Sequence, residues 1–254
     1  MKLWVFSDLH LEASDLYQEF LSVLDQQVQS QDIVVFAGDI FDLFVGGSPH
    51  FKAKFSDFFI VLRKLEERQV QLHYIFGNHD FNLSRAFGDL RIQLHDESVE
   101  FTVGAAGDFK KIYIAHGDLV DQTDVNYLRL RKLFRSAPMR ALSTVLPGSW
   151  IERFGNLISR KSDQKVVDLP ESWTQENRQV LRKKFREFAS AKHRQGFDFV
   201  ILGHCHDLDE QTPFYWNMGY PPVHRQYLCY DSEIGKFLRH KFTEIPHKNC
   251  ENTN

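Results

Sequence analysis

Five short segments of the chain combine Asp, Asn and His, the residue types that bind metal ions and transfer protons. Each segment follows an apolar, β-prone run, which is typical of a buried strand. The carboxyl ends of such strands form the usual ligand site of an open α/β sheet, so we expect these side chains to meet on one rim. The candidate ligands are Asp8, His10, Asp39, Asn78, His116, His204 and His206.

This set of side chains predicts a site for two divalent metal ions. A carboxylate can bridge two ions because each oxygen can take one, and Asp39 is the candidate bridge. Mixed nitrogen and oxygen ligands suit manganese, iron, zinc or cobalt. Two ions roughly 3.5–4 Å apart can lower the pKa of a bridging water and polarise a phosphoryl oxygen. The hydroxide would then attack phosphorus in line with the leaving oxygen.

Each segment taken alone has a structural explanation. His116 could be a core histidine with satisfied hydrogen bonds, and Gly77 and Gly203 could be turn glycines. Five segments in order, each after a predicted strand, favour the metal site over this alternative. The remaining histidines lack such a context and receive no metal role: His50, His73, His95, His193, His224, His240 and His247.

The elements that must position these residues alternate between strand and helix in the first third of the chain. Strands are expected at 2–6, 32–37 and 70–76, and helices from a cap at Ser14 to Gln29 and over 51–68. This order predicts a parallel sheet. Segments 98–103 and 111–115 predict an antiparallel hairpin. Later strands are expected at 197–202, 214–217, 223–229 and 236–242.

Residues 122–195 interrupt the strands, and we interpret them as a helical insertion within a single domain spanning 1–254. Helical periods cover 124–133, 140–158 and 174–194, with breaks at Pro138 and Pro147-Gly148. Between Val125 and Lys165 there are nine Lys and Arg but two Asp and Glu, among many apolar residues. The insertion is either a subdomain packed on the sheet or a basic, apolar cap for an amphiphilic anion or a membrane surface.

Composition places the chain among ordinary globular proteins. It has 254 residues, of which 43% are hydrophobic and 26% charged. Residues 1–120 contain 10 Lys and Arg against 18 Asp and Glu, whereas the remainder contains 21 against 16. Three cysteines, an N-terminus that reads as a core strand and the lack of a long apolar run predict a cytoplasmic protein, with peripheral contact to the inner membrane as an option.

The five segments resemble the blocks of calcineurin-like metallophosphoesterases, with Gly38-Asp39-Ile40-Phe41-Asp42 and Gly77-Asn78-His79-Asp80 among them. The resemblance implies a four-layer α/β/β/α sandwich. It also implies two metal ions, Mn²⁺ in the first instance. One ion would be held by Asp8, His10, Asp39 and His206, and the other by Asp39, Asn78, His116 and His204. His79 would act near the leaving group as an acid or oxyanion stabiliser, oriented by Asp42 or Asp80.

Within the superfamily, Leu43-Phe44 stands where protein phosphatases carry Arg-Gly, which argues against a protein phosphatase. The helical insertion and segment 118–127 resemble UDP-2,3-diacylglucosamine hydrolases of lipid A biosynthesis, whose cap holds acyl chains and whose metals release UMP. That resemblance implies substrate contacts by Asn78, Asp124, Tyr127, Ser159 and Lys165. The best-known branch has Arg at the position of His79, which favours a sister branch or another pyrophosphate or phosphodiester substrate.

Three functional hypotheses follow. The first is a two-metal hydrolase of a nucleotide-sugar lipid, the second a soluble phosphodiesterase or phosphatase with a small substrate, and the third a non-enzymatic scaffold stabilised by metals. An intact His79 beside every ligand argues against the scaffold. Nucleic-acid binding is disfavoured because net charge is −3 and the basic insertion is rich in Leu and Phe. No protein partner is inferred.

Overall fold

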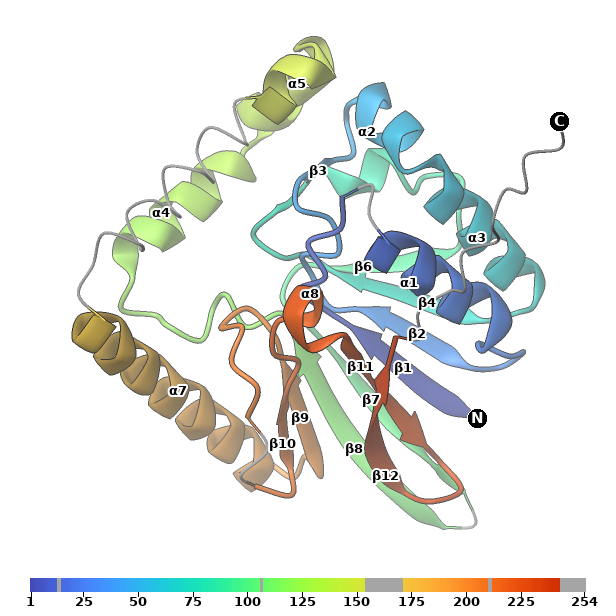
Figure 1. Ribbon diagram of the computed structural model, residues 1–254, viewed down its shortest axis with the longest axis vertical. Coiled ribbons are helices and arrows are strands. Elements are labelled where there is room, and N and C mark those ends of the chain that lie inside the picture. Colours follow the sequence, from blue (N-terminus) through green and yellow to red (C-terminus); the bar gives the residue numbers. More distant parts are fainter. Residues whose placement is uncertain (13–14, 106, 154–170, 210–211, 243–254) are drawn as a thin grey trace, which may run out of the picture.

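Two β-sheets pack face to face, and helices cover both outer sides (Figure 1). This computed structural model describes residues 1–12, 15–105, 107–153, 171–209 and 212–242. The apolar layer between the sheets contains Val5 and Val35 from one sheet and Ile112, Ile114 and Ile201 from the other. The arrangement is the expected four-layer α/β/β/α sandwich.

The first sheet has six strands, with the parallel strands predicted from the repeated strand–helix pattern at its centre. Its order is β12 (Lys236–Lys241), β11 (Gln226–Asp231), β1 (Lys2–Phe6), β2 (Ile33–Phe36), β4 (Gln71–Ile75) and β6 (Ile92–His95). Strands β1, β2, β4 and β6 run parallel, and β11 and β12 add an antiparallel edge. The prediction of a strand at 223–229 was partly wrong, because helix α8 (Pro221–His224) precedes β11.

The second sheet has four strands in the order β10 (Tyr215–Asn217), β9 (Phe199–Leu202), β8 (Asp108–Ala115) and β7 (Ser98–Ala105). Strands β7 and β8 form the antiparallel hairpin predicted from the sequence, with Ser98 opposite Ala115. Strand β9 runs parallel to β8, so the segments after both strands emerge at the same edge. A further pair, β3 (Phe44–Val45) and β5 (Asp80–Phe81), lies outside both sheets.

Helices α1 (Asp15–Gln26) and α3 (Ser56–Glu67) cover the outer face of the first sheet. Helix α1 buries Leu16, Phe20, Val23 and Leu24, the stripe expected of an amphipathic helix. The prediction of one helix over 51–68 was wrong, because α2 (Pro49–Lys54) and α3 are separate helices. Phe55 leaves helical geometry between them, at φ −110° and ψ 32°. Its ring packs 4.0 Å from that of Phe41, so the chain bends where both helices keep apolar contact with the core.

The segment between β8 and β9 contains helices α4 (Val125–Phe134), α5 (Ala137–Val145) and α7 (Glu171–Arg194). Helix α7 buries Phe185 and Ala189 against the outer face of the second sheet. Helices α4 and α5 bury no side chain completely and project to one side of the molecule (Figure 1). Pro138 lies in the first turn of α5, where a missing N–H costs nothing. None of the described helices is long and apolar enough to cross a membrane.

Candidate metal centre

The segments after five strands converge at one edge of the two sheets, where the sequence placed the ligand site. Strands β1, β2 and β4 of the first sheet and β8 and β9 of the second all supply side chains there. Carboxylate and imidazole atoms close enough to share an ion occur in three groups within the described residues. The groups are Asp8, His10 and His206; Asp8, Asp39 and His116; and His10, Asp42 and His79.

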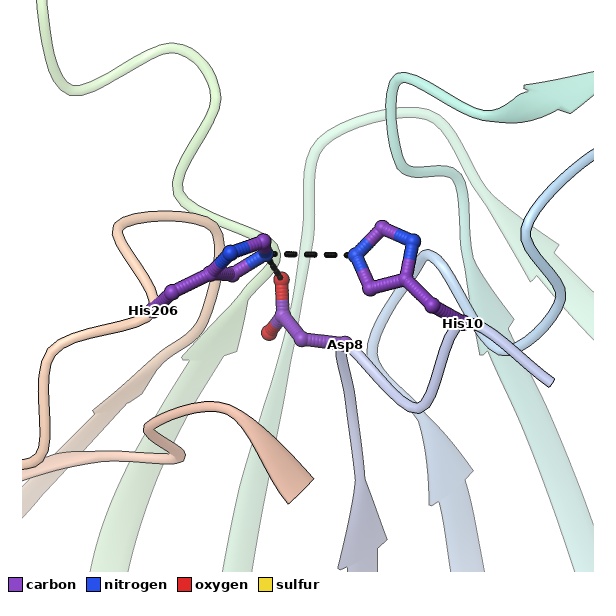
Figure 2. A group of neighbouring side chains, drawn as sticks. All are labelled: Asp8, His10 and His206. Atoms are coloured by element: carbon purple, nitrogen blue, oxygen red, sulfur yellow. Dashed lines mark hydrogen bonds and ion pairs between the residues drawn. The ribbon is translucent and has the colours of Figure 1, made fainter. Parts of the chain in front are cut away.

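Figure 2 shows the first group, in which His10 and His206 face each other above the carboxylate of Asp8. The Nε2 atoms of the two histidines lie 3.2 Å apart, and His206 Nε2 lies 3.4 Å from Asp8 Oδ1. The other carboxylate oxygen, Asp8 Oδ2, accepts a hydrogen bond of 2.5 Å from Ser7 Oγ. Two ring nitrogens and one carboxylate oxygen therefore face a common point.

The second group centres on Asp39, whose Oδ2 lies 3.4 Å from His116 Nε2. Asn78 joins this group through its side-chain oxygen. Its Oδ1 lies 3.0 Å from His116 Nε2 and 2.9 Å from His204 Nδ1. All seven ligand candidates from the sequence are thus brought into two adjoining clusters, with Asp8 and Asp39 side by side in one of the groups.

The backbone at the ligand positions is held in an unusual conformation. Asp8, His10, Asp39, His204 and His206 all have left-handed φ values, between 43° and 66°. Non-glycine residues rarely adopt this region, and such conformations persist where surrounding structure enforces them, often at functional sites. Nine non-glycine residues have positive φ in the described chain, so this site accounts for most of them.

Two glycines allow the loops to approach the buried carboxylates. A Cβ atom at Gly77 would lie 2.1 Å from Asp39 Oδ1, and one at Gly203 would lie 2.2 Å from Asp8 Oδ2. Both distances are far below a van der Waals contact, so no other residue fits without displacing a ligand. These glycines therefore serve the site, in addition to forming turns.

The two buried carboxylates make the site strongly negative. Asp8 is fully buried, Asp39 is 1% exposed, and no Lys or Arg of the described chain forms an ion pair with either. Burial alone would raise the pKa of Asp39, but the charge and hydrogen bond of His116 lower it below the usual range. Burial would likewise lower the pKa of His116, and the charge of Asp39 raises it to about 10.

This electrostatic pattern fits divalent cations. The raised pKa of His116 favours a proton on its ring. A bound cation would supply the same positive charge and leave the imidazole neutral for ligation. Burial and the charge of His116 lower the pKa of His204 to about 4, so its ring is in the neutral, ligating form at pH 7. The donor set is of the mixed type suited to manganese, iron, zinc or cobalt.

His79 lies at the exposed side of the site. Its Nδ1 contacts the backbone oxygen of Asp42, and its Nε2 lies 4.0 Å from Asp39 Oδ2. The carboxylate of Asp42 lies 3.7 Å from His10 Nδ1 instead. Asp80 does not act on His79 in this structure but accepts backbone N–H groups from Asp39, at 3.0 Å, and Gly77, at 2.9 Å. Burial and the charge of Asp39 raise the pKa of Asp80 to about 6.

Of the four substrate contacts expected in the insertion, the structure describes Asp124 and Tyr127. Asp124 caps α4 by accepting a hydrogen bond of 2.9 Å from Tyr127 N. The hydroxyl of Tyr127 donates to Asp118 Oδ2 at 2.6 Å, and its ring lies 6.1 Å from His204. Ser159 and Lys165 lie outside the described residues.

Sequence reasoning missed Tyr220, whose ring stacks on His206 with centroids 4.7 Å apart. It lies three residues after β10 but belongs to none of the five segments, so only the packing of α8 against the site reveals it. Tyr220 also lines a pocket of about 440 Å³ that adjoins the site. The remaining lining residues are Arg178, Leu181, Arg182, Cys205, His206, Asp207, Val223 and His224.

Comparison with known proteins agrees with this geometry. The model of the calcineurin-like phosphoesterase family matches residues 1–208. The chain belongs to this family. It is therefore a metal-dependent hydrolase of the phosphoesterase type, as the five sequence segments predicted.

Several curated relatives of this phosphoesterase carry the name UDP-2,3-diacylglucosamine hydrolase. The protein from Psychromonas ingrahamii is 25% identical over 213 residues, covering 81% of each chain. The protein from Pseudomonas paraeruginosa is 28% identical over 216 residues, covering 81% of this chain and 82% of the relative. Among solved structures, YfcE, a phosphoesterase from E. coli, covers 96% of this chain at 13% identity with a TM-score of 0.41.

Proposed function

We propose that this phosphoesterase is a two-metal hydrolase of UDP-2,3-diacylglucosamine or a related nucleotide-sugar lipid, releasing UMP and a lipid monophosphate. The observation that carries the proposal is the convergence of two buried carboxylates, four imidazoles and one amide oxygen at one sheet edge. The named relatives supply the substrate class.

Each ion would take its ligands from both sheets. Asp8, His10 and His206 would hold one ion and Asn78, His116 and His204 the other, with Asp39 as a ligand of both. The mix of imidazole nitrogen with carboxylate and amide oxygen suits manganese, iron, zinc or cobalt. Of these we propose manganese, the ion that the family resemblance implies. When bound, the two ions would activate a water molecule and polarise a phosphoryl oxygen.

His79 is the proposed proton donor to the leaving oxygen. Its Nδ1 contacts the Asp42 carbonyl, which fixes the ring orientation and leaves Nε2 directed toward the buried carboxylates. The side chain is 28% exposed, so a bound substrate can reach it. Asp80 holds the amides of Asp39 and Gly77 and so keeps the two neighbouring loops in register.

The helical insertion would serve as a cap that holds the acyl chains and contacts the inner membrane surface from the cytoplasm. Large apolar side chains on α4, on α5 and on the residues that follow α5 are exposed, namely Val125, Leu130, Leu133, Leu142, Val145, Leu146 and Trp150. Basic residues such as Lys132 and Arg140 lie among them and suit an anionic substrate or surface. Asp124, Tyr127, Ser159 and Lys165 remain the proposed polar contacts.

The direct test is incubation of the protein with UDP-2,3-diacylglucosamine and Mn²⁺, with UMP release followed by chromatography. We expect UMP and lipid monophosphate in equal amounts, and loss of at least 100-fold in rate for Asp39→Asn, which removes one charge from the bridge. If the protein hydrolyses other phosphate esters but releases no UMP from UDP-2,3-diacylglucosamine, this substrate is excluded. Equal turnover by wild type and a folded Asp39→Asn variant would exclude the metal mechanism.

A second candidate is a soluble phosphodiesterase acting on a small substrate. The observation that favours it is His79, which replaces the Arg of the best-known lipid A branch. Comparing turnover of a small diester, bis(p-nitrophenyl) phosphate, with turnover of the diacyl substrate distinguishes the two functions. Robust hydrolysis of the small diester, with no higher rate on the substrate that carries acyl chains or in detergent micelles, would favour the small-substrate enzyme.

A further inference from the structure

Two segments of the insertion repeat the same spacing of basic and aromatic residues. The first is Arg131-Lys132-Leu133-Phe134-Arg135, at the end of α4, and the second is Arg182-Lys183-Lys184-Phe185-Arg186, in α7. Arginines four residues apart lie on one helix face. In both segments this face is directed toward the loops of the candidate metal centre, as the contacts of each residue show.

The first arginine of each segment binds a carboxylate next to a proposed ligand. Arg131 Nε donates to Asp118 Oδ2 at 2.8 Å, and Asp118 lies two residues after His116. Arg182 Nη2 donates to Asp207 Oδ1 at 2.5 Å, and Asp207 directly follows His206. Each pair therefore ties a helix to a ligand-bearing loop from a different strand.

The last arginine of each segment adds a second attachment point. Arg135 Nη2 donates to the backbone oxygens of Gly77, at 3.2 Å, and Phe76, at 3.4 Å, immediately before Asn78. Arg186 forms two bonds with the buried Asp209, at 2.6 Å and 3.1 Å. Guanidinium groups are suited to such paired contacts because their N–H groups form a rigid planar fork.

The phenylalanine of each segment packs against the same regions. The Phe134 ring lies 5.3 Å from that of Phe81, in the strand that follows the Asn78 loop. Phe185 is buried, and a Cβ atom at Gly117 would lie 2.9 Å from its ring. Gly117 separates His116 from Asp118, so this ring covers the loop that Arg131 holds from the other helix.

We propose that the two segments are arginine clamps that hold the metal-bearing loops in ligating position. The α4 clamp positions Asn78 and His116, and the α7 clamp positions His206. The helical insertion is thereby part of the frame of the metal centre, as well as a cap. The proposal rests on the proposed function only in its choice of ligands. The four arginines are positioning residues, since none of them is required to touch substrate.

The test compares Arg135→Gln and Arg182→Gln with Arg129→Gln and Lys183→Gln, which remove a charge from the same helices. Arg129 is exposed, and Lys183 is 78% exposed and forms an ion pair with Glu187, at 3.9 Å, on its own helix. Metal content after Mn²⁺ loading and dialysis is measured by mass spectrometry. Hydrogen–deuterium exchange of peptides covering 76–80 and 203–209 is measured in EDTA, so that loop order is read without metal.

We expect the control variants to retain two ions per chain and the wild-type exchange pattern. Arg135→Gln should fall toward one ion, exchange faster at 76–80 alone and lose on the order of 10-fold in kcat with little change in KM. Arg182→Gln should show the faster exchange at 203–209. Arg135→Lys, which retains charge without the fork, should recover part of the loss.

Clamp variants that match the controls in metal content and exchange, in a background where wild type binds two ions, would overturn the clamps and leave the proposed function intact. Wild type that binds no metal would overturn the proposed function instead. In that case, faster exchange in EDTA would still report on the clamps. A variant that unfolds globally would show faster amide exchange in all peptides. If Arg135→Gln does so, Arg135→Lys is compared with wild type in its place.

Discussion

At the scale of single residues, the candidate site combines metal ligands in left-handed backbone conformations with one partly exposed histidine. Five ligand candidates have left-handed φ values, whereas His79 lies at the exposed side with one ring nitrogen held by the carbonyl of Asp42. Its ring also packs edge-on against His10, with centroids 4.9 Å apart. The position of His79 therefore suits action on the substrate more than retention of an ion.

Replacing His79 by Ala should separate these two roles. We expect His79→Ala to retain two ions and to lose roughly 10²- to 10³-fold in kcat on substrates with a poor leaving group, the range typical of general acid catalysis. The loss should be much smaller for bis(p-nitrophenyl) phosphate, because p-nitrophenolate leaves without a proton. His193→Ala, at a histidine that contacts Phe197 O and lies outside the site, is the control. Equal losses on both substrates would remove His79 from the leaving-group step.

The metal ligands could be predicted from sequence because each lies within a few residues of a strand, and parallel strands deliver their ends to one edge. Contacts that depend on packing between separate segments gave no such signal. Tyr220 stacks on His206 through the placement of α8, and Asp80, expected from its segment to orient His79, accepts the backbone amides of Asp39 and Gly77 instead. Their parts depend on tertiary packing, which the spacing of residues does not encode.

At the scale of elements, most strands were predicted with ends within three residues of those observed, whereas the short strands β3, β5 and β6 were not predicted. Strand β6 went unpredicted because its residues are only partly buried and its pattern is short. It nevertheless completes the parallel sheet through β4 and brings the ring of His95 to that of His73. The break at Phe55 was also invisible, since the apolar period of α2 and α3 continues across it.

The His73–His95 pair links strands β4 and β6 through ring nitrogens 3.0 Å apart. His73 Nε2 is buried and has no hydrogen-bond partner within the described part of the chain. Burial first, and the charge of His95 second, lower the pKa of His73 to about 4. The folded chain therefore resists protonation here, while the unfolded chain takes up the proton near pH 6.5.

This pair predicts a loss of stability in acid. Between about pH 6.5 and pH 4 the unfolded state binds the proton and the folded state does not, so the free energy of unfolding falls as pH falls through this window. We expect wild type to lose on the order of 2 kcal/mol more than His73→Phe between pH 7 and pH 4.5. Urea unfolding in EDTA measures the difference without metal contributions. Identical losses in the two proteins would contradict the shift at His73.

At the scale of the whole molecule, two charge regimes meet at the metal centre. The first 120 residues are acidic and supply most ligands, while the later part has 21 Lys and Arg against 16 Asp and Glu and supplies the insertion. Part of the insertion's positive charge is used internally, since Arg131, Arg135, Arg182 and Arg186 contact the site loops. The apolar side chains of α4 and α5 remain exposed, which favours contact with an apolar partner.

If that partner is the acyl part of the substrate and the lipid surface around it, a charge placed there should weaken both contacts. Val145 is 80% exposed at the end of α5, so Val145→Asp disturbs no packing in the fold. Since burying a side chain of this size contributes about 1.5–3 kcal/mol, we expect roughly 10-fold weaker binding to anionic phospholipid vesicles and a similar rise in KM for the diacyl substrate. Turnover of bis(p-nitrophenyl) phosphate should not change.

Ile60→Asp, at an exposed apolar position on α3 where the side chain is 54% exposed, is the control and should bind vesicles as wild type does. Vesicle flotation and initial rates measured on both variants separate the surface from the catalytic site. If Val145→Asp and Ile60→Asp behave alike on the vesicles and on the diacyl substrate, the exposed face of α4 and α5 does not contact lipid. The insertion would then act on the metal centre through its arginines alone.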